Sequence, residues 1–265
     1  MITHIGAFPA LGIAGVSTLQ ALALVCPLVV RIAEDGLDRV EILIASLSTA
    51  IFWDLVFGAV RKRSYGFHGV TVALVATIMV PLVLPVWQLV LTLSLGLVLG
   101  EHIFGGRGFG FLSPATVALA LLLFSFTQVQ LEPLSQSVAF ATFPGALLLL
   151  LFGLIQWRIV VAVLACLVLL TLSFGYEVDF LSIGIAVIFG LSFLICDPVS
   201  AAATNLGRWY YGLLAGLLVF VFSGSDGSLT PGGVIFASLG AGVFAPLIDR
   251  LVVIAHTRKR RREIA

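Results

Sequence analysis

Long apolar segments follow one another along this chain, separated by short polar or Gly/Pro-rich breaks. A helix crosses a hydrocarbon core about 30 Å thick with roughly 17–25 apolar residues. Charged residues make up 10% of the 265 residues, against about 25% in a soluble domain. This is too little charge to cover the surface of a protein that is surrounded by water. The sequence therefore predicts an all-α polytopic membrane protein with about ten transmembrane helices. The expected spans are residues 8–31, 41–60, 67–84, 86–104, 111–127, 137–155, 158–175, 180–196, 209–223 and 233–254.

Positive charge is distributed unevenly between the loops that join these segments. If both termini are cytoplasmic, twelve Lys and Arg residues fall on the cytoplasmic side and two, Arg31 and Arg39, fall in outside loops. Because Lys and Arg concentrate on the cytoplasmic side of membrane proteins, we expect this orientation. Residues 258–262, in the basic tail 256–265, either anchor this topology or dock a cytoplasmic partner. Away from this tail the sequence has no basic face, and its net charge is +1, so nucleic acid is not an expected partner.

Two seven-residue segments share the pattern G-x-G-x-x-x-P. They are residues 108–114 and 240–246, which start 132 positions apart, half the length of the chain. Because five spans separate them, they would cross the membrane in opposite directions. We therefore expect two inverted five-helix repeats, residues 1–132 and residues 133–265. The alternative is that Gly and Pro simply recur in membrane helices.

Proline also breaks the third and eighth expected spans, at Pro81 and at Asp197-Pro198. Irregular backbone is tolerated within a membrane only where protein covers it or where it lines a water-filled cavity. Interrupted helices at corresponding positions of two repeats mark the central site in many transporters. We therefore expect broken half-helices and an ion or substrate pathway near them. The candidate pathway residues are Asp54, Ser113, Pro114, Thr116, Asp197, Pro198, Ser200, Asn205, Pro246 and Asp249.

Ionisable side chains inside membrane segments are functional candidates by default, but several of them have two interpretations. Asp54 could bind or relay a cation, or it could serve a neighbouring helix end or Arg61. Glu101 and His102 could form a proton relay, or they could be an interfacial pair.

Two further carboxylates fit structural as well as functional roles. Asp197 could cap a short helix running through Ser200 to Asn205, because Pro198 would then occupy the first helical turn. Asp249 ends the tenth expected span, and we expect it to form a structural pair with Arg250.

Five segments carry a family likeness. Residues 103–108 and 112–115 are similar to an F-G-G-x-G…N-P-A stretch, and residues 197–201 read D-P-V-S-A. Residues 245–249 read A-P-L-I-D before a basic tail, and residues 156–158 fit an S-W-R turn. Together these segments resemble the NqrB/RnfD family. Its members are membrane subunits of the sodium-translocating NADH:quinone oxidoreductase and of the Rnf ferredoxin:NAD oxidoreductase.

The resemblance implies a ten-helix inverted repeat in the bacterial inner membrane, related in shape to urea channels. It also implies a subunit of a flavin-linked electron-transfer complex that couples redox to Na⁺ or H⁺ transport. The partners would be other membrane, iron–sulfur and flavin subunits. The chain itself would be at most a non-catalytic or flavin-holding subunit, since no nucleophile–base pattern occurs. The alternative is a stand-alone channel or transporter for a small solute with urea-channel-like architecture.

The cofactor expectation departs from the family pattern. Family members carry S-G-A-T, whose threonine takes FMN through a phosphodiester, and that string is absent here. The nearest string, Ser113-Pro-Ala-Thr116, aligns with N-P-A and lies at the cytoplasmic end of its span. We therefore expect no covalent FMN on Thr116, which leaves non-covalent FMN or riboflavin as the candidate cofactor. No metal site is expected, because the three cysteines form no C-x-x-C pair.

Overall fold

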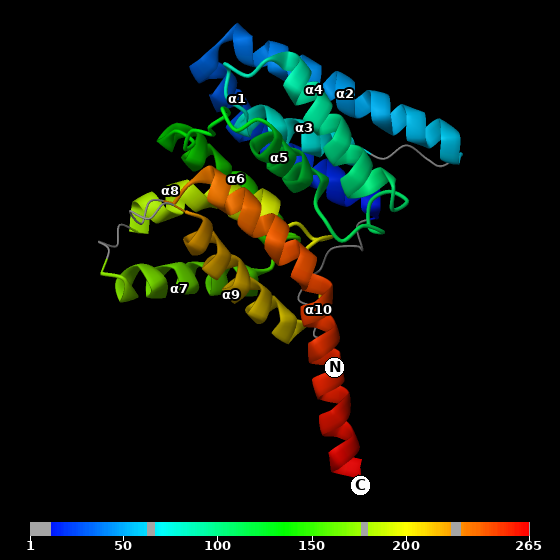
Figure 1. Ribbon diagram of the computed structural model, residues 1–265, viewed down its shortest axis with the longest axis vertical. Helices are drawn as coiled ribbons and strands as arrows, with labels where there is room; N and C mark the ends of the chain where they lie inside the picture. Colours follow the sequence, from blue (N-terminus) through cyan, green and yellow to red (C-terminus); the bar gives the residue numbers. More distant parts are fainter. Residues whose placement is uncertain (1–11, 63–66, 176–179, 224–228, 265) are drawn as a thin grey trace.

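The computed structural model describes residues 12–62, 67–175, 180–223 and 229–264, and within these residues it contains ten α-helices and no strand (Figure 1). The all-α expectation is confirmed. Residues 8–11 of the first expected span lie outside the described part, as do the side chains of residues 259–262 in the tail. The helices are α1 (Ile13–Asp35), α2 (Leu37–Arg61), α3 (His68–Met79), α4 (Val86–Leu97), α5 (Pro114–Ser125), α6 (Gln136–Leu151), α7 (Trp157–Ser173), α8 (Phe180–Gly190), α9 (Asn205–Phe222) and α10 (Pro231–Ile264). Two π-helical turns, η1 (Val98–His102) and η2 (Leu191–Ile195), continue α4 and α8.

The helices differ in whether they are long enough to cross a bilayer. Four of them, α1, α2, α9 and α10, are long and apolar enough to do so. The others are shorter apolar helices; α3 and α5 have 12 residues each and rise about 18 Å, well short of a hydrocarbon core. Ten helices are therefore confirmed, whereas four of the ten expected spans are single helices of spanning length.

The junction between α1 and α2 corrects the expected outside loop around Arg31 and Arg39. Both arginines lie in helices, and Gly36, with a φ of 73°, joins α1 directly to α2. Arg39 is fully buried, and it donates to the carbonyls of Thr77 (2.7 Å) and Val80 (2.6 Å). The last carbonyls of a helix lack intrahelical partners, and Pro81 stops α3 here. Arg39, which the sequence placed in an outside loop, is therefore buried and bonds the free carbonyls at the end of α3.

The two G-x-G-x-x-x-P segments have different structures. Gly108 lies in the loop before α5, and Pro114 is the first residue of that helix, where its missing N–H leaves no bond unmade. Residues 240–246 instead lie inside α10, which begins with its own proline, Pro231. The shared pattern therefore does not mark equivalent positions, although α5 and α10 both start with proline.

The helices pack in pairs that recur along the chain. Helix α4 packs against α2 and α5, and later α9 packs against α7 and α10. In the same way α3 packs against α1 and α5, and α8 packs against α6 and α10. Helix α1 also lies along α6 (Figure 1), so closely that a Cβ on Gly145 would collide with the carbonyl oxygen of Ala23.

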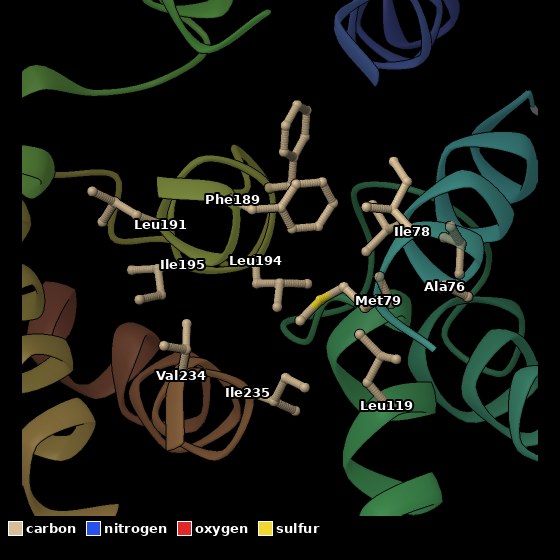
Figure 2. Packing of buried hydrophobic residues seen from close by; sticks show 14 of the residues in the cluster. Ala76, Ile78, Met79, Leu119, Phe189, Leu191, Leu194, Ile195, Val234 and Ile235 are labelled. Atoms are coloured by element: carbon tan, nitrogen blue, oxygen red, sulfur yellow. The ribbon is translucent and has the colours of Figure 1, made fainter. Parts of the chain in front are cut away.

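Apolar side chains fill the middle of the molecule, where α3, α5, α8 with η2, and α10 meet (Figure 2). Met79 extends from the end of α3 toward Leu194 of η2, and Leu119 and Ile235 lie beside them. Ile235 and Leu194 are 0% exposed, Leu119 is 1% exposed and Met79 is 7% exposed. We call these four residues the apolar centre. The apolar centre joins the end of α3 to η2, the turn that continues α8.

Candidate functional site

Seven polar side chains from six segments meet near η1, the start of α3 and the second half of α2. Five of them are buried, and the side chains of the other two, Asp54 and Arg107, are 13% and 6% exposed. Buried polar groups are retained where they are bonded or functional, so this group is the candidate site. We call it the polar cluster: Gln20, Asp54, His68, Glu101, His102, Arg107 and Asp197.

Arg107 connects four of the six segments. Its Nη2 donates to Oε1 of Gln20 at 2.6 Å and lies 3.5 Å from Oδ1 of Asp197, while its Nη1 contacts Nδ1 of His68. Gln20 in turn donates to Oδ1 of Asp197 at 3.4 Å. Burial lowers the pKa of the Arg107 guanidinium and the Asp197 carboxylate opposes that shift, but arginine remains charged in proteins.

A glycine-rich loop positions Arg107. Gly105, Gly106 and Gly108 have φ values of 117°, 103° and 92°, a region that residues with a Cβ rarely adopt. The loop therefore turns back on η1, where the backbone N–H of Gly106 donates to the Glu101 carbonyl at 3.1 Å. This local fold accounts for the three glycines of the segment F-G-G-R-G.

The π-helical turn η1 presents Glu101 and His102 to two different partners. Nε2 of His102 lies 3.4 Å from Oδ1 of Asp54, and its ring stacks on Phe57 with centroids 4.6 Å apart. Oε2 of Glu101 lies 3.6 Å from Nε2 of His68. Such π-helical turns widen a helix by one residue and are frequent at functional sites.

The charges of the polar cluster do not balance. Three carboxylates, Asp54, Glu101 and Asp197, face one permanent cation, Arg107. Oε2 of Glu101 and Nε2 of His102 are buried without a hydrogen-bond partner. Among the described residues, no three His, Cys, Asp or Glu side chains converge closely enough to hold a metal ion. The arrangement can therefore take up protons on its carboxylates and imidazoles, or a monovalent cation beside them.

A small cavity borders the polar cluster between the glycine-rich loop and the residues after η2. Four cluster members, His68, Glu101, Arg107 and Asp197, line it, together with Gly100, Gly106, Gly108, Gly110, Leu112, Pro114 and Val199. A second cavity of about 410 Å³ lies between α6, α7 and α8 and is apolar. The polar groups are thus next to the small cavity.

Four sequence-predicted site residues meet in the polar cluster: Asp54, Glu101, His102 and Asp197. The Asp54 carboxylate also lies against Gly69 in the first turn of α3, so closely that a Cβ on Gly69 would collide with it. It therefore serves a neighbouring helix end, one of its two expected roles, and lies beside the candidate proton relay as well. Arg61, the other expected partner, stacks over Phe57 instead.

The predicted residues around the start of α5 lie at a helix interface. Ser113 precedes the helix and is buried, but its side chain makes no capping bond. Pro114 lines the small cavity. Thr116 is 2% exposed, and its Oγ1 lies 3.2 Å from Oγ of Ser238 in α10. Ser113 and Pro114 thus lie near the polar cluster, and Thr116 lies between α5 and α10.

The short helix expected after Asp197 is wrong, although its capping bond is present. Oδ2 of Asp197 accepts the backbone N–H of Ser200 at 3.3 Å, and Pro198 lies in an exposed turn. The chain then becomes helical at Asn205, where Thr204, and not Asp197, caps α9 by accepting the N–H of Gly207. Threonine one residue before the helix is the better-placed cap.

The expected pairing of Asp249 with Arg250 is also wrong. Asp249 accepts the backbone N–H groups of Ala203 (2.7 Å) and Thr204 (3.0 Å) and the hydroxyl of Thr204 (2.5 Å). It therefore fixes the loop that precedes α9, while α10 continues past it to Ile264. Pro246 is exposed inside α10 and does not belong to the polar cluster.

Sequence reasoning missed Gln20, His68 and Arg107. Gln20 is a polar residue within an otherwise apolar span, and that is the signal that could have identified it. His68 stands at the start of a span. Arg107 was counted as a topology charge, although the glycines around it indicated a special loop.

Comparisons with known proteins cover nearly the whole chain. A family model described as the NQR2, RnfD, RnfE family matches residues 10–135 and 131–258. Three relatives are each named as a subunit of Na(+)-translocating NADH-quinone reductase. The chain is 29% identical over 268 positions to that of Pseudomonas aeruginosa (strain LESB58), 28% over 269 to that of Yersinia pestis, and 30% over 267 to that of Ectopseudomonas mendocina (strain ymp). Each match covers 79% of this chain and 65% of the relative. The apolar helices and these relatives together indicate a multi-pass bacterial membrane protein.

Proposed function

The chain belongs to the NQR2, RnfD, RnfE family, and on that premise we propose that it is an integral membrane subunit of a flavin-linked electron-transfer complex that couples redox to Na⁺ or H⁺ transport. The relatives are named as a subunit of a Na⁺-translocating NADH-quinone reductase, and this chain spans about two thirds (65%) of their length. The observation that carries the proposal is the polar cluster. Buried ionisable groups are rare in membrane helices and mark ion pathways and proton relays.

In this proposal the polar cluster is the entry point for the ion. The expected orientation places it on the cytoplasmic side, because Arg61 and Arg107 belong to the cytoplasmic loops. The excess of carboxylates over cations attracts a proton or a monovalent cation. Glu101 and His68, and separately Asp54 and His102, are near enough to share protons after modest movement of their side chains. Arg107 holds the segments together.

We extend the proposal to the architecture: ten membrane spans in two inverted repeats, residues 1–132 and 133–265, with both termini in the cytoplasm of a bacterial cell. The recurring helix pairs support it, since α2–α4, α4–α5 and α3–α5 correspond to α7–α9, α9–α10 and α8–α10. Pairs of short, Gly/Pro-interrupted helices at corresponding positions are typical of such repeats.

The alternative, a stand-alone channel for a small solute, is disfavoured by the apolar centre. A solute passing between the two repeats would meet Met79, Leu119, Leu194 and Ile235, all of them buried in one apolar cluster. A polar solute would lose its hydrogen bonds there without replacement. A coupled transporter needs such a barrier, because an open path would dissipate the gradient.

The flavin proposal is limited to non-covalent FMN or riboflavin. Thr116 does not fit covalent attachment, since its hydroxyl is buried against Ser238 between α5 and α10. When bound, a flavin would supply one- and two-electron transfer. The partners we propose are iron–sulfur and flavin subunits and other membrane subunits, together with the bilayer.

The test uses the complex purified gently from bacterial membranes and reconstituted into vesicles. Electron transfer is started with NADH or with reduced ferredoxin, and uptake of ²²Na⁺ and of protons is measured together with electron flow. We expect Glu101→Gln to remove most of the ion uptake per electron, while the exposed control Glu132→Gln retains it. Flavin absorbance before and after denaturation separates bound from covalent cofactor.

A contrary result is equally definite. Protein that purifies alone, carries no flavin and conducts a small neutral solute across vesicles would overturn the redox proposal. Equal ion uptake per electron in Glu101→Gln and Glu132→Gln would remove the polar cluster from the pathway.

A further inference from the structure

Two arginines converge on one uncharged oxygen where α7 and α9 begin. Nη1 of Arg158 donates to Oδ1 of Asn205 at 2.6 Å, and Nη1 of Arg208 lies 3.4 Å from the same oxygen. Helices α7 and α9 pack closely, since Gly212 lies against Ala162 and the Ile159 carbonyl. The packing therefore fixes two like charges side by side.

The carboxylate in this neighbourhood is already engaged. Asp249 accepts three hydrogen bonds from Ala203 and Thr204. Within the described residues, neither Arg158 nor Arg208 forms an ion pair at 4.0 Å or less. Two adjacent guanidinium groups that share a neutral acceptor repel each other, and an anion between them would relieve that repulsion.

The surroundings of the two arginines are those of a membrane interface. Trp157 and Trp209 meet edge to face with centroids 5.9 Å apart, and the Arg158 guanidinium lies 5.2 Å from the centre of the Trp157 ring. Trp157 is 53% exposed, and Tyr210, which follows Trp209 in α9, is 58% exposed. Trp and Tyr are enriched at the level of the lipid headgroups, and α9, a helix of spanning length, starts here.

We propose that Arg158 and Arg208 bind the phosphate of a phospholipid headgroup, with preference for anionic lipids. Guanidinium groups match phosphate oxygens with paired hydrogen bonds, and basic pockets between membrane helices bind lipid head groups. A free phosphate has the same chemistry. The exposed apolar side chains Leu206 and Trp157 favour the lipid, since they offer contact to its acyl chains. This site is independent of the redox role.

The proposal is tested by native mass spectrometry of the whole protein in detergent with phosphatidylglycerol or phosphatidylcholine added. We expect the wild type to retain phosphatidylglycerol preferentially. Arg158→Gln and Arg208→Gln should each weaken retention about fivefold, the equivalent of ~1 kcal/mol per charge near the membrane surface. The control Lys62→Gln removes an exposed positive charge that lies before α3 and should leave retention unchanged. Excess inorganic phosphate distinguishes a lipid phosphate from a free phosphate as the ligand. If the site binds lipid, the bound phosphatidylglycerol remains when phosphate is added.

A measurement on the wild-type chain does not depend on how the variants fold. Brominated phosphatidylglycerol in nanodiscs should quench tryptophan fluorescence more than brominated phosphatidylcholine, since Trp157 and Trp209 adjoin the site. Equal quenching by both lipids overturns the proposal. Equal loss of retention in Lys62→Gln and Arg158→Gln, or displacement of the lipid by phosphate, also overturns it.

Discussion

The polar cluster and the apolar centre share α3 and adjoin each other after η2, yet they have opposite chemistry. Helix α3 begins with His68 in the polar cluster and ends with Met79 in the apolar centre. On the other side, Leu194 and Asp197 are three residues apart. A charge that reaches Asp197 therefore faces a packed apolar layer within one turn. The comparison teaches that the polar cluster can collect an ion while the apolar centre blocks its passage. The ion can therefore cross only when the apolar centre opens.

Loss of Arg107 should have the largest effect. Arg107→Gln leaves Asp197 and Gln20 buried with a partner missing, and breaking a buried ion pair from one side costs about 3–5 kcal/mol. We expect the free energy of unfolding in mixed micelles to fall by about that amount. Arg258→Gln, an exposed arginine on α10, is the matched control. If Arg107→Gln unfolds like the control, the polar cluster is not one connected network.

Opening a hole in the apolar centre should have the next largest effect. Leu194→Ala removes a side chain that is 0% exposed, and such truncations cost about 2–5 kcal/mol. Leu147→Ala, at a position 44% exposed on α6, should cost much less. Chemical denaturation of both variants measures the difference. Similar values for the two would mean that the centre is no better packed than the outer face.

The contact between α4 and α5 links the polar cluster to the apolar centre, because α4 leads into Glu101 and α5 carries Leu119. A Cβ on Gly96 would collide with Ala118, so Gly96→Ala should destabilise the protein by about 1–3 kcal/mol through overpacking. Gly184→Ala meets nothing within 4 Å and is the control. Thermal unfolding that is equal for the two variants would show that α4 and α5 can move apart freely.

The smallest expected effect is at Thr116. Thr116→Val removes its hydrogen bond to Ser238, and such bonds between membrane helices contribute about 0.6 kcal/mol on average. A double-mutant cycle with Ser238→Ala isolates this coupling. A coupling near zero would show that polar contacts between α5 and α10 add nothing to the apolar packing beside them.

The sequence allowed the helices to be predicted better than the polar contacts. Ten apolar segments bounded by charges, Gly and Pro correspond to ten helices, because apolar length is a local property. Asp249 was assigned to Arg250 because the two are adjacent in sequence, yet consecutive side chains on a helix do not face each other. Arg39 was placed in a loop, because nothing local indicates that it satisfies carbonyls 38 and 41 residues later.

About half of the polar cluster could be predicted, because a polar residue in an apolar segment is itself a local signal. Asp54, Glu101, His102 and Asp197 are each unusual within an apolar segment. His68 and Arg107 look ordinary at the ends of expected spans, and their importance appears only when the folded chain brings α1, α3 and the glycine-rich loop together.

The contacts of Gln20 have a consequence for how the protein is made. Its partners Arg107 and Asp197 lie 87 and 177 residues further along the chain. At a synthesis rate of roughly 5–20 residues per second, the ribosome needs on the order of 10–35 s to reach Asp197 after Gln20. Until then α1 lacks at least one of the two partners of its one buried amide side chain. Helix α1, made before the other described helices, is thus among the last of them to complete its contacts.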